Sequence, residues 1–284
     1  MRRAARALFL AVPLIWVAVA HLGPLAAMVR ISLLAVYPGP PGATPPWSVA
    51  AYAAFLEGTG FRFSLWRSLW LAVATTGAAL LLAYPLAYHV ALKVEPARRG
   101  RRLALLLAPF WTSEVLRMFA LVLLLANRGA VNSLLRWAGL APLPILYGNG
   151  AVLAGLLYAV LLTMLLPLYA ALERMRPDVL AAAATLGARA GRRFWQVTLP
   201  LSASGVAAGV VLTFLATLGI FAAPALLGGA GTPVFATTIV DMFGAASGRW
   251  PLGAAFGFIL LAAGTAAAVC LGALAPGLRR ARWP

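Results

Sequence analysis

Six long apolar stretches constrain this 284-residue chain more than any other feature. They cover approximately residues 7–29, 68–92, 103–126, 151–172, 205–227 and 252–275. A helix rises about 1.5 Å per residue, so roughly 20 apolar residues cross the ~30 Å hydrocarbon core of a bilayer. With 63% hydrophobic and only 10% charged residues, the chain has too few charged groups to cover a water-facing surface. We therefore predict an all-α integral membrane protein with six transmembrane helices.

The positive charges predict which side of the membrane each loop faces. The net charge is +17, from 23 Lys and Arg against 6 Asp and Glu. If the N-terminus is cytoplasmic, most of the cations fall in inside segments, as is typical of cytoplasmic loops. They are Arg2, Arg3, Arg6, Lys93, Arg98, Arg99, Arg101, Arg102, Arg174, Arg176, Arg189, Arg192, Arg193, Arg279, Arg280 and Arg282. Both termini are then cytoplasmic, and the charge marks topology rather than a nucleic-acid partner.

The first apolar stretch allows two interpretations. Three arginines before an apolar run are also typical of a secretory signal peptide. The run continues past His21 to residue 29, and no sharp small-x-small cleavage site follows it, which favours a retained helix. We divide the chain into residues 1–64, with this helix and a Pro/Gly-rich periplasmic loop, and residues 65–284, with a five-helix core. One cysteine and two distant histidines exclude a disulfide framework and a paired His or Cys metal site.

The inside segment 173–200 is patterned unlike the other loops. Pro177 and Asp178 suit the first turn of a helix, and Gly187 suits its end. A second short helix with Phe194 and other apolar residues is expected to stop at Pro200. Such exposed apolar side chains need a partner, which is either a protein surface or the membrane interface. The pattern alone does not separate these two.

The spacing in this segment resembles the EAA loop of binding-protein-dependent ABC transporter permeases. The family pattern is Glu-Ala-Ala, three residues, Gly, nine residues, an aliphatic residue, any residue, Leu-Pro. The matching positions are Ala182, Ala183, Gly187, Val197, Leu199 and Pro200. Ala181 stands where the family usually has Glu. Residues 84–88, 109–113, 167–173, 224–229 and 250–255 further resemble the permeases of spermidine/putrescine importers.

The resemblance implies a MetI-like ABC importer permease fold in a multi-pass protein of the bacterial cell inner membrane. It also implies that segment 173–200 docks as a coupling loop onto a cytoplasmic ABC ATPase dimer. The residues expected to form this contact are Asp178, Val179, Ala181, Ala182, Ala183, Leu186, Gly187, Arg189, Val197, Leu199 and Pro200. Other implied partners are a second permease subunit, a periplasmic or lipid-anchored solute-binding protein, and membrane lipid. For the second subunit, a different chain is favoured over another copy.

The chain contains no Gly-x-x-x-x-Gly-Lys-[Ser/Thr] sequence with which to hold ATP. We therefore predict a transport subunit rather than an enzyme, without a cofactor of its own, whose partner ATPase binds ATP and Mg²⁺. The resemblance implies import of a small solute, a polyamine such as spermidine or putrescine, by ATP-driven alternating access. The alternative is an ion- or proton-coupled secondary carrier, which needs several buried acids or histidines. Only Glu114 and His89 are available for that role.

Polar and bulky residues within the spans are candidates for the translocation path. They are Glu114, Arg117, Phe214, Leu218, Phe221 and Asp241. The i, i+3 spacing of Glu114 and Arg117 favours a self-neutralising pair over contact of Glu114 with a cationic substrate. Phe214, Leu218 and Phe221 fit an apolar gate or a packed helix face equally well, and Asp241 also fits an ordinary loop residue.

Two Gly-x-x-x-Gly pairs, at residues 205 and 209 and at residues 253 and 257, permit close helix approach. We attribute both to packing within one subunit, because small residues are abundant in all the spans.

Overall fold

The computed structural model describes residues 11–274, except residues 41, 43, 230, 232 and 245–247. The terminal cations on which the predicted topology partly rests lie outside the described residues. These are Arg2, Arg3, Arg6, Arg279, Arg280 and Arg282. The beginning of the predicted first span and residue 275 of the sixth span lie outside them as well.

The chain divides into two compact units. The first consists of Met1–Ser64 and Thr238–Leu261, and the second of Leu65–Thr237 and Ala262–Pro284. The first unit holds η1 (Ala18–Leu22), α2 (Gly23–Ser32), α3 (Ala50–Glu57), most of α14 (Phe235–Phe243) and the first half of α15 (Trp250–Leu274). Phe256 is fully buried there, with the rings of Phe55 and Phe61 edge-on at 5.6 and 4.8 Å.

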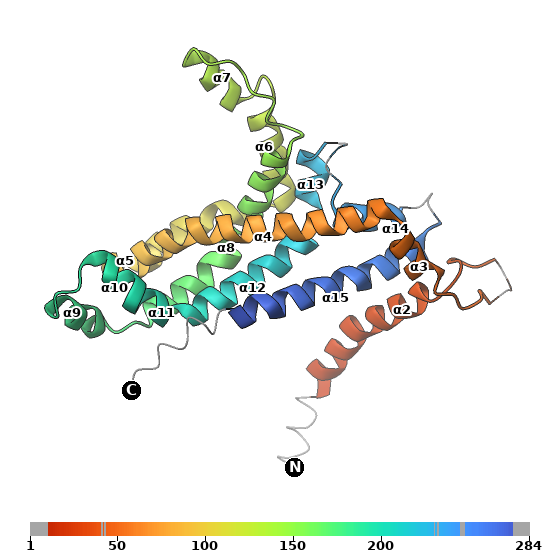
Figure 1. The fold of residues 1–284 in the computed structure, drawn as a ribbon, viewed down its shortest axis with the longest axis horizontal. Helices are drawn as coiled ribbons and strands as arrows, with labels where there is room; N and C mark the ends of the chain where they lie inside the picture. The colour runs from red at the N-terminus through yellow and green to blue at the C-terminus, as the bar shows by residue number, and fades with distance from the viewer. Residues whose placement is uncertain are drawn as a thin grey trace. The chain divides into compact units, whose positions relative to one another are not determined.

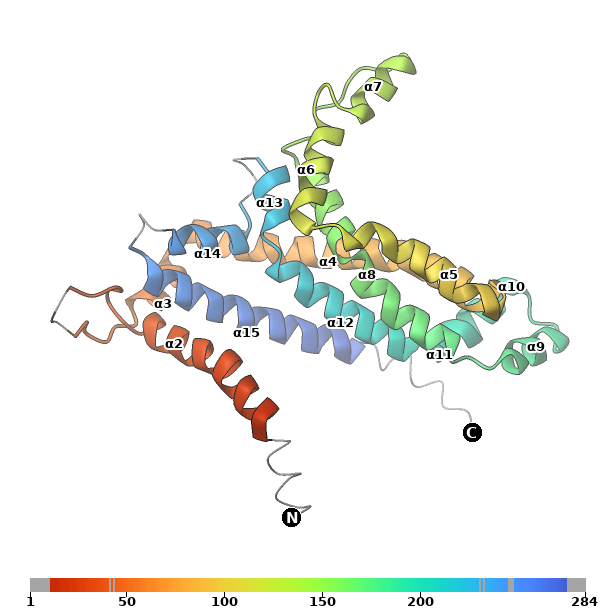
Figure 2. The same cartoon turned by 180° about the vertical axis from the view of Figure 1, so that it is seen from behind.

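The second unit contains the remaining helices (Figure 1, Figure 2). They are α4 (Thr59–Tyr88), whose first residues belong to the first unit, η2 (His89–Lys93), α5 (Pro96–Leu107), η3 (Ala108–Trp111), α6 (Glu114–Leu125), α7 (Ala130–Trp137), α8 (Asn149–Glu173), α9 (Pro177–Thr185), α10 (Ala190–Arg193), η4 (Phe194–Thr198), α11 (Leu199–Leu201), α12 (Ala203–Gly219) and α13 (Ala222–Leu227). α4, α8 and α12 run side by side, and α6 and α7 project away from these three (Figure 1, Figure 2).

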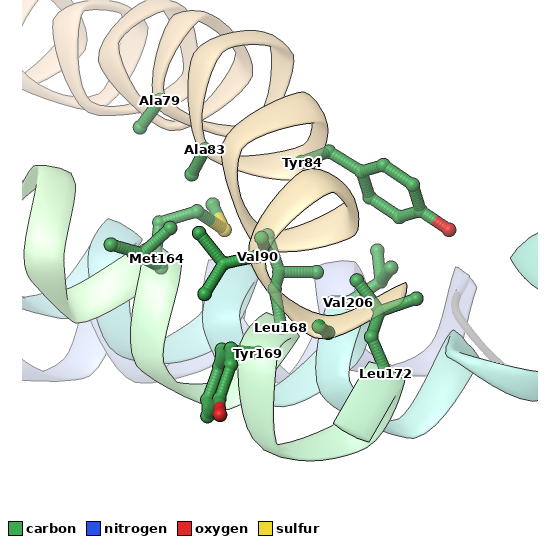
Figure 3. Close-up of a cluster of buried hydrophobic side chains, with 12 residues drawn as sticks. Ala79, Ala83, Tyr84, Val90, Met164, Leu168, Tyr169, Leu172 and Val206 are labelled. Atoms are coloured by element: carbon green, nitrogen blue, oxygen red, sulfur yellow. The ribbon is translucent and has the colours of Figure 1, made fainter. Parts of the chain in front are cut away.

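The membrane-spanning core of this unit is built on small residues facing large ones. Ala79 and Ala83 on α4 are fully buried beside Met164 and Leu168 of α8 (Figure 3). Without a hydrophobic driving force between helices in lipid, such close van der Waals packing stabilises the bundle.

α12 approaches α8 through its glycines. A Cβ on Gly205 would lie 2.6 Å from the Pro167 carbonyl oxygen, and one on Gly209 would lie 2.8 Å from the Met164 sulfur. The predicted close packing of this pair within one subunit is confirmed. The second pair is mixed, because a Cβ on Gly253 would lie 2.9 Å from the Phe243 ring, whereas one on Gly257 would have no neighbouring atom within 4 Å.

The all-α membrane fold is confirmed. Five described helical segments are long and apolar enough to span a membrane: Ala11–Ser32, Thr59–Lys93, Glu114–Trp137, Asn149–Glu173 and Trp250–Ala273. A sixth candidate is the bent pair Ala190–Leu201 and Ala203–Gly219, whose axes differ by 66°.

The predicted third span, residues 103–126, is wrong as one continuous helix. α5 ends at Leu107, a 3₁₀ turn follows, and Thr112 and Ser113 are extended before α6 begins. Pro109 lies in the 3₁₀ turn and donates no backbone hydrogen bond, which accounts for the interruption. The fifth span is likewise shorter than predicted, because α12 ends at Gly219.

The second helix of the segment 173–200 was predicted to stop at Pro200, and it ends one residue later, at Leu201. Helical structure continues from Ala190 to Leu201, and the 66° bend follows at Ser202. Proline is tolerated because it lies in the first turn of α11, directly after the π-helical turn η4.

Candidate functional site

The coupling-loop candidate begins with α9, whose start follows the predicted chemistry. Pro177 is the first residue of the helix, where a missing N–H costs nothing. Asp178 lies in the first turn, where a negative charge complements the positive helix end, and its carboxylate is 3.2 Å from the Arg176 guanidinium. Both partners of this ion pair are exposed, so it contributes little stability.

Gly187 ends α9 as predicted. Its φ is +77°, its N–H donates to the Ala184 carbonyl over 3.0 Å, and the Ala188 N–H donates to the Ala183 carbonyl over 3.1 Å. These two bonds form a Schellman motif, which requires a residue in the left-handed region. A side chain at Gly187 would meet no atom within 4 Å, so backbone conformation rather than space selects glycine here.

The tip of the loop presents apolar surface outward. Leu186 is 87% exposed and Val179 is 38% exposed. Ala181, Ala182 and Arg189 are exposed as well, and Ala183 is half-buried. An apolar side chain as exposed as Leu186, on a helix end rigidly terminated by Gly187, is suited to burial against another surface.

The base of the loop is anchored to the membrane helices. The Phe194 ring packs edge-on against the Tyr84 ring of α4, with centroids 5.4 Å apart. The Tyr84 hydroxyl is hydrogen-bonded to the Ser202 hydroxyl over 2.8 Å, and Ser202 is fully buried. The other predicted contact residues of this half, Val197, Leu199 and Pro200, are half-buried.

Sequence reasoning missed Tyr84 and Ser202. Their hydrogen bond joins residues 118 positions apart in the chain, and a pattern within residues 173–200 does not reveal such a contact. Together these contacts make the loop a protruding tip on a fixed base, attached directly to the ends of α8 and α12.

A cleft of about 530 Å³ adjoins the loop on the side of α8 and α12. Its lining includes Pro167, Ala171, Arg174, Val179 and Gly205. The tip of the loop is therefore accessible along this flank as well.

In the membrane-embedded part, the predicted Glu114–Arg117 pair is wrong. The Arg117 guanidinium instead lies 5.2 Å from the ring centroids of both Phe110 and Tyr158. Its Nε and Nη1 atoms are buried and have no hydrogen-bond partner among the described residues, while Glu114 is exposed at the start of α6. A long helical side chain leans towards the N-terminal turn, which carries Arg117 to the aromatic ring of η3. Cation–π contact with two rings then replaces the expected ion pair.

The three apolar path candidates of the second unit, Phe214, Leu218 and Phe221, do not share one environment. Phe214 is fully buried and Leu218 is 6% exposed, so both belong to the packed side of α12. Phe221 lies beyond the end of α12 and is 49% exposed. Asp241 is exposed on the helix α14, so the alternative interpretation of it as an ordinary loop residue is wrong. The described residues include no group of three or more His, Cys, Asp or Glu side chains that could hold a metal.

Comparison with known proteins gives a consistent set of relatives. The family described as "Binding-protein-dependent transport system inner membrane component" matches residues 96–280. The spermidine/putrescine transport system permease protein PotB of Haemophilus influenzae is 37% identical over 193 residues, covering 67% of each chain. The inner membrane ABC transporter permease protein YdcU of Escherichia coli is 34% identical over 257 residues, covering 86% of this chain and 81% of that one.

A solved structure shares the fold. It is a bacterial alginate ABC transporter in complex with an alginate pentasaccharide-bound periplasmic protein. The two chains superpose with a TM-score of 0.78 over 98% of this chain and 95% of the other, at 17% sequence identity. At that identity the likeness concerns the fold alone.

Proposed function

Because this chain belongs to the family of binding-protein-dependent transport system inner membrane components, we propose that it imports a polyamine such as spermidine or putrescine. As a member of that family it is the permease subunit of an ABC importer in the inner membrane. The fold described above, with its five or six candidate spans, agrees with this role.

The coupling loop is the observation that carries the mechanism. A cytoplasmic ATPase dimer binds the exposed tip around Leu186, and closure of that dimer on ATP moves the loop. The base anchored by Phe194 and Tyr84 transmits the movement to α8 and α12, whose rearrangement alternates access to the solute. ATP and Mg²⁺ are held by the ATPase, and this chain requires no cofactor of its own.

Two further partners complete the importer. A periplasmic or lipid-anchored binding protein delivers the solute, and a second permease, a different chain, lines the path together with this one. Both termini face the cytoplasm, together with the cations at the end of η2, in α5 and in the coupling loop.

Docking is tested with two glycines of the same loop. Gly187→Glu forces a side chain into a left-handed position, whereas Gly191→Glu introduces the same charge into α10 at a position where a Cβ also meets no atom within 4 Å. We expect Gly187→Glu to abolish co-purification with the ATPase and Gly191→Glu to preserve most of it. Equal retention of the ATPase by both variants contradicts docking through the Gly187 turn, and recovery of no Walker-type ATPase with the unmodified chain favours a secondary carrier.

The proposal that the substrate is a polyamine is based on the polyamine permeases among the relatives, and it is tested separately. Uptake of radiolabelled spermidine by the reconstituted importer is expected to be saturable and to be inhibited by unlabelled putrescine. Glu114→Gln and Asp241→Asn each remove an exposed carboxylate that is available to a cationic solute. A rise in the KM for spermidine in either variant identifies that carboxylate as a contact, and uptake indifferent to polyamines contradicts the substrate assignment.

A further inference from the structure

A second cleft adjoins the coupling loop at the ends of two membrane helices. Its volume is about 630 Å³. It is bounded by η2 at the end of α4, by α5, by the end of α8 and by α9, α10 and η4 of the loop. It therefore lies where the chain leaves the hydrocarbon core.

The charged side chains of this cleft are mainly positive. Lys93, Arg99 and Arg193 line it, opposed by a single carboxylate, that of Glu173. That carboxylate accepts a hydrogen bond from the Tyr169 hydroxyl over 2.7 Å. In the described part of the chain none of the three cations forms an ion pair, so the cleft carries an excess of positive charge.

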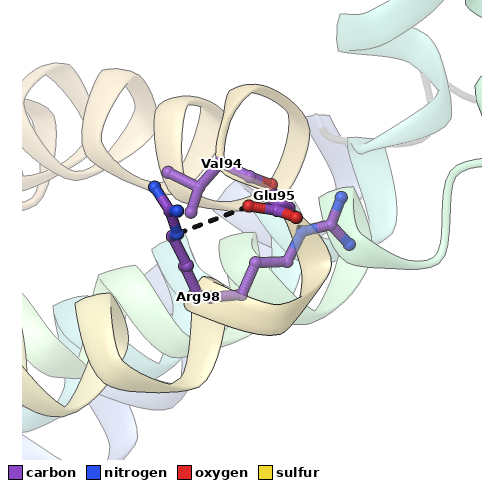
Figure 4. Close-up of polar contacts among 4 residues, drawn as sticks. Val94, Glu95 and Arg98 are labelled. Carbon is purple, nitrogen blue, oxygen red and sulfur yellow. Dashed lines mark hydrogen bonds and ion pairs between the residues drawn. The ribbon is translucent and has the colours of Figure 1, made fainter.

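The neighbouring acid is already engaged elsewhere. The Glu95 carboxylate lies 3.3 Å from the Arg98 guanidinium, on the exposed surface of α5 (Figure 4). Arg99, half-buried, donates from Nε to the Val94 carbonyl over 3.1 Å. This bond holds the arginine side chain in place. No described residue is hydrogen-bonded to its two terminal nitrogens, which are therefore available to an anion.

We propose that this cleft binds a phosphate-bearing anion through Lys93, Arg99 and Arg193. Arginine forks match the geometry of phosphate oxygens, and basic pockets between membrane helices suit anionic headgroups. Bound there, the phosphate joins α5 to the coupling loop, because Arg99 belongs to α5 and Arg193 to α10.

The surroundings favour the headgroup of an anionic phospholipid as the source of the phosphate. Part of the lining is apolar, from Ala91, Leu92, Met175 and Leu180. Such an apolar wall can contact the glycerol and the first acyl carbons of a lipid. Free phosphate has no apolar part that could contact it. The ends of α4 and α8 also place the cleft at headgroup depth.

The test compares two double variants with equal charge change in the same two segments. Arg99→Gln with Arg193→Gln removes two cleft cations, whereas Arg98→Gln with Arg192→Gln removes their exposed sequence neighbours, which do not line the cleft. The purified full-length chain is titrated with phosphatidylglycerol in neutral detergent, and bound lipid is counted by native mass spectrometry. A parallel titration uses inorganic phosphate alone. Thermal unfolding verifies that each variant is folded.

We expect saturable binding of phosphatidylglycerol. Each basic residue near an anionic surface contributes roughly 1 kcal/mol, about five-fold in affinity. The cleft variant should therefore bind phosphatidylglycerol about 25-fold more weakly than the parent chain. The control variant should bind it within about two-fold of the parent chain. Equal affinity for inorganic phosphate at the same site identifies free phosphate as the source. Should the cleft variant fail to fold, a second pair of double variants keeps the charge. Arg99→Lys with Arg193→Lys changes the cleft, and Arg98→Lys with Arg192→Lys is its control. We expect only the cleft double variant to weaken binding of phosphatidylglycerol. Equal weakening in a matched pair, or no saturable binding by the parent chain, overturns the proposal.

Discussion

Replacing Gly205 by alanine tests the close contact between α8 and α12. The added Cβ would lie 2.6 Å from the Pro167 carbonyl oxygen and closer still to the Ala171 Cβ, where ordinary contact begins at 3.4 Å, so the helices must separate by at least about 0.8 Å. Both obstructing atoms are fixed to the backbone of α8 and cannot rotate away. Overpacking of this kind costs about 1–3 kcal/mol, and the better helix propensity of alanine offsets about 1 kcal/mol of it. We expect a net loss of up to about 2 kcal/mol in the free energy of unfolding.

Gly257→Ala is the matched control. It makes the same substitution within α15 at a site where a Cβ has no neighbour within 4 Å, so only the propensity gain of about 1 kcal/mol applies. Denaturant or thermal unfolding of the two purified variants should therefore place their free energies of unfolding about 1–3 kcal/mol apart. Since α8 and α12 carry the two ends of the coupling loop, uptake per ATP hydrolysed by the reconstituted importer should fall only for Gly205→Ala. Unfolding midpoints as high for Gly205→Ala as for Gly257→Ala would refute the close contact.

Three further substitutions test single side chains. Asn132→Ala removes the amide that donates to the Leu143 carbonyl over 3.0 Å and accepts from its N–H over 2.8 Å, so the free energy of unfolding falls by about 2–3 kcal/mol and hydrogen exchange in residues 127–143 accelerates. Tyr84→Phe removes one of the two hydrogen bonds of the buried Ser202 hydroxyl, which still donates to the Leu199 carbonyl over 3.1 Å. We expect a loss of about 1 kcal/mol in the free energy of unfolding, and an unchanged unfolding temperature would contradict the bond to Tyr84. Arg117→Met replaces a buried charge, which has no hydrogen-bonded counter-ion among the described residues, with an apolar side chain. We therefore expect the thermal unfolding temperature to rise or stay constant. A strong destabilisation would show that the aromatic contacts outweigh the cost of burying the charge.

The sequence predicts the elements whose signal is local. The span 151–172 coincides with α8 to within two residues at each end, because uninterrupted apolar length is sufficient to define it. The turn at Gly187 was predictable for the same reason, since a helix end needs only its own last residues and a residue able to adopt positive φ.

Elements that depend on distant partners were not predictable in this way. Arg117 and Glu114 have ideal spacing for a pair, yet the rings of Phe110 and Tyr158 occupy the guanidinium, and Tyr158 is 41 positions away in the chain. The interruption between α5 and α6 has a different origin, because its cause, Pro109, is local; hydropathy alone does not reveal it, since the residues on both sides of it remain apolar.

In the proposed mechanism, the bend at Ser202 determines how movement of the coupling loop reaches α12. A displacement along the axis of Ala190–Leu201 resolves into cos 66°, about 0.4, along α12 and sin 66°, about 0.9, across it. A push delivered through this segment therefore tilts α12 sideways more than twice as far as it slides the helix along its axis. The bend thus converts an axial displacement of the loop segment mainly into a tilt of α12, and such a tilt can widen one end of a solute path while it narrows the other.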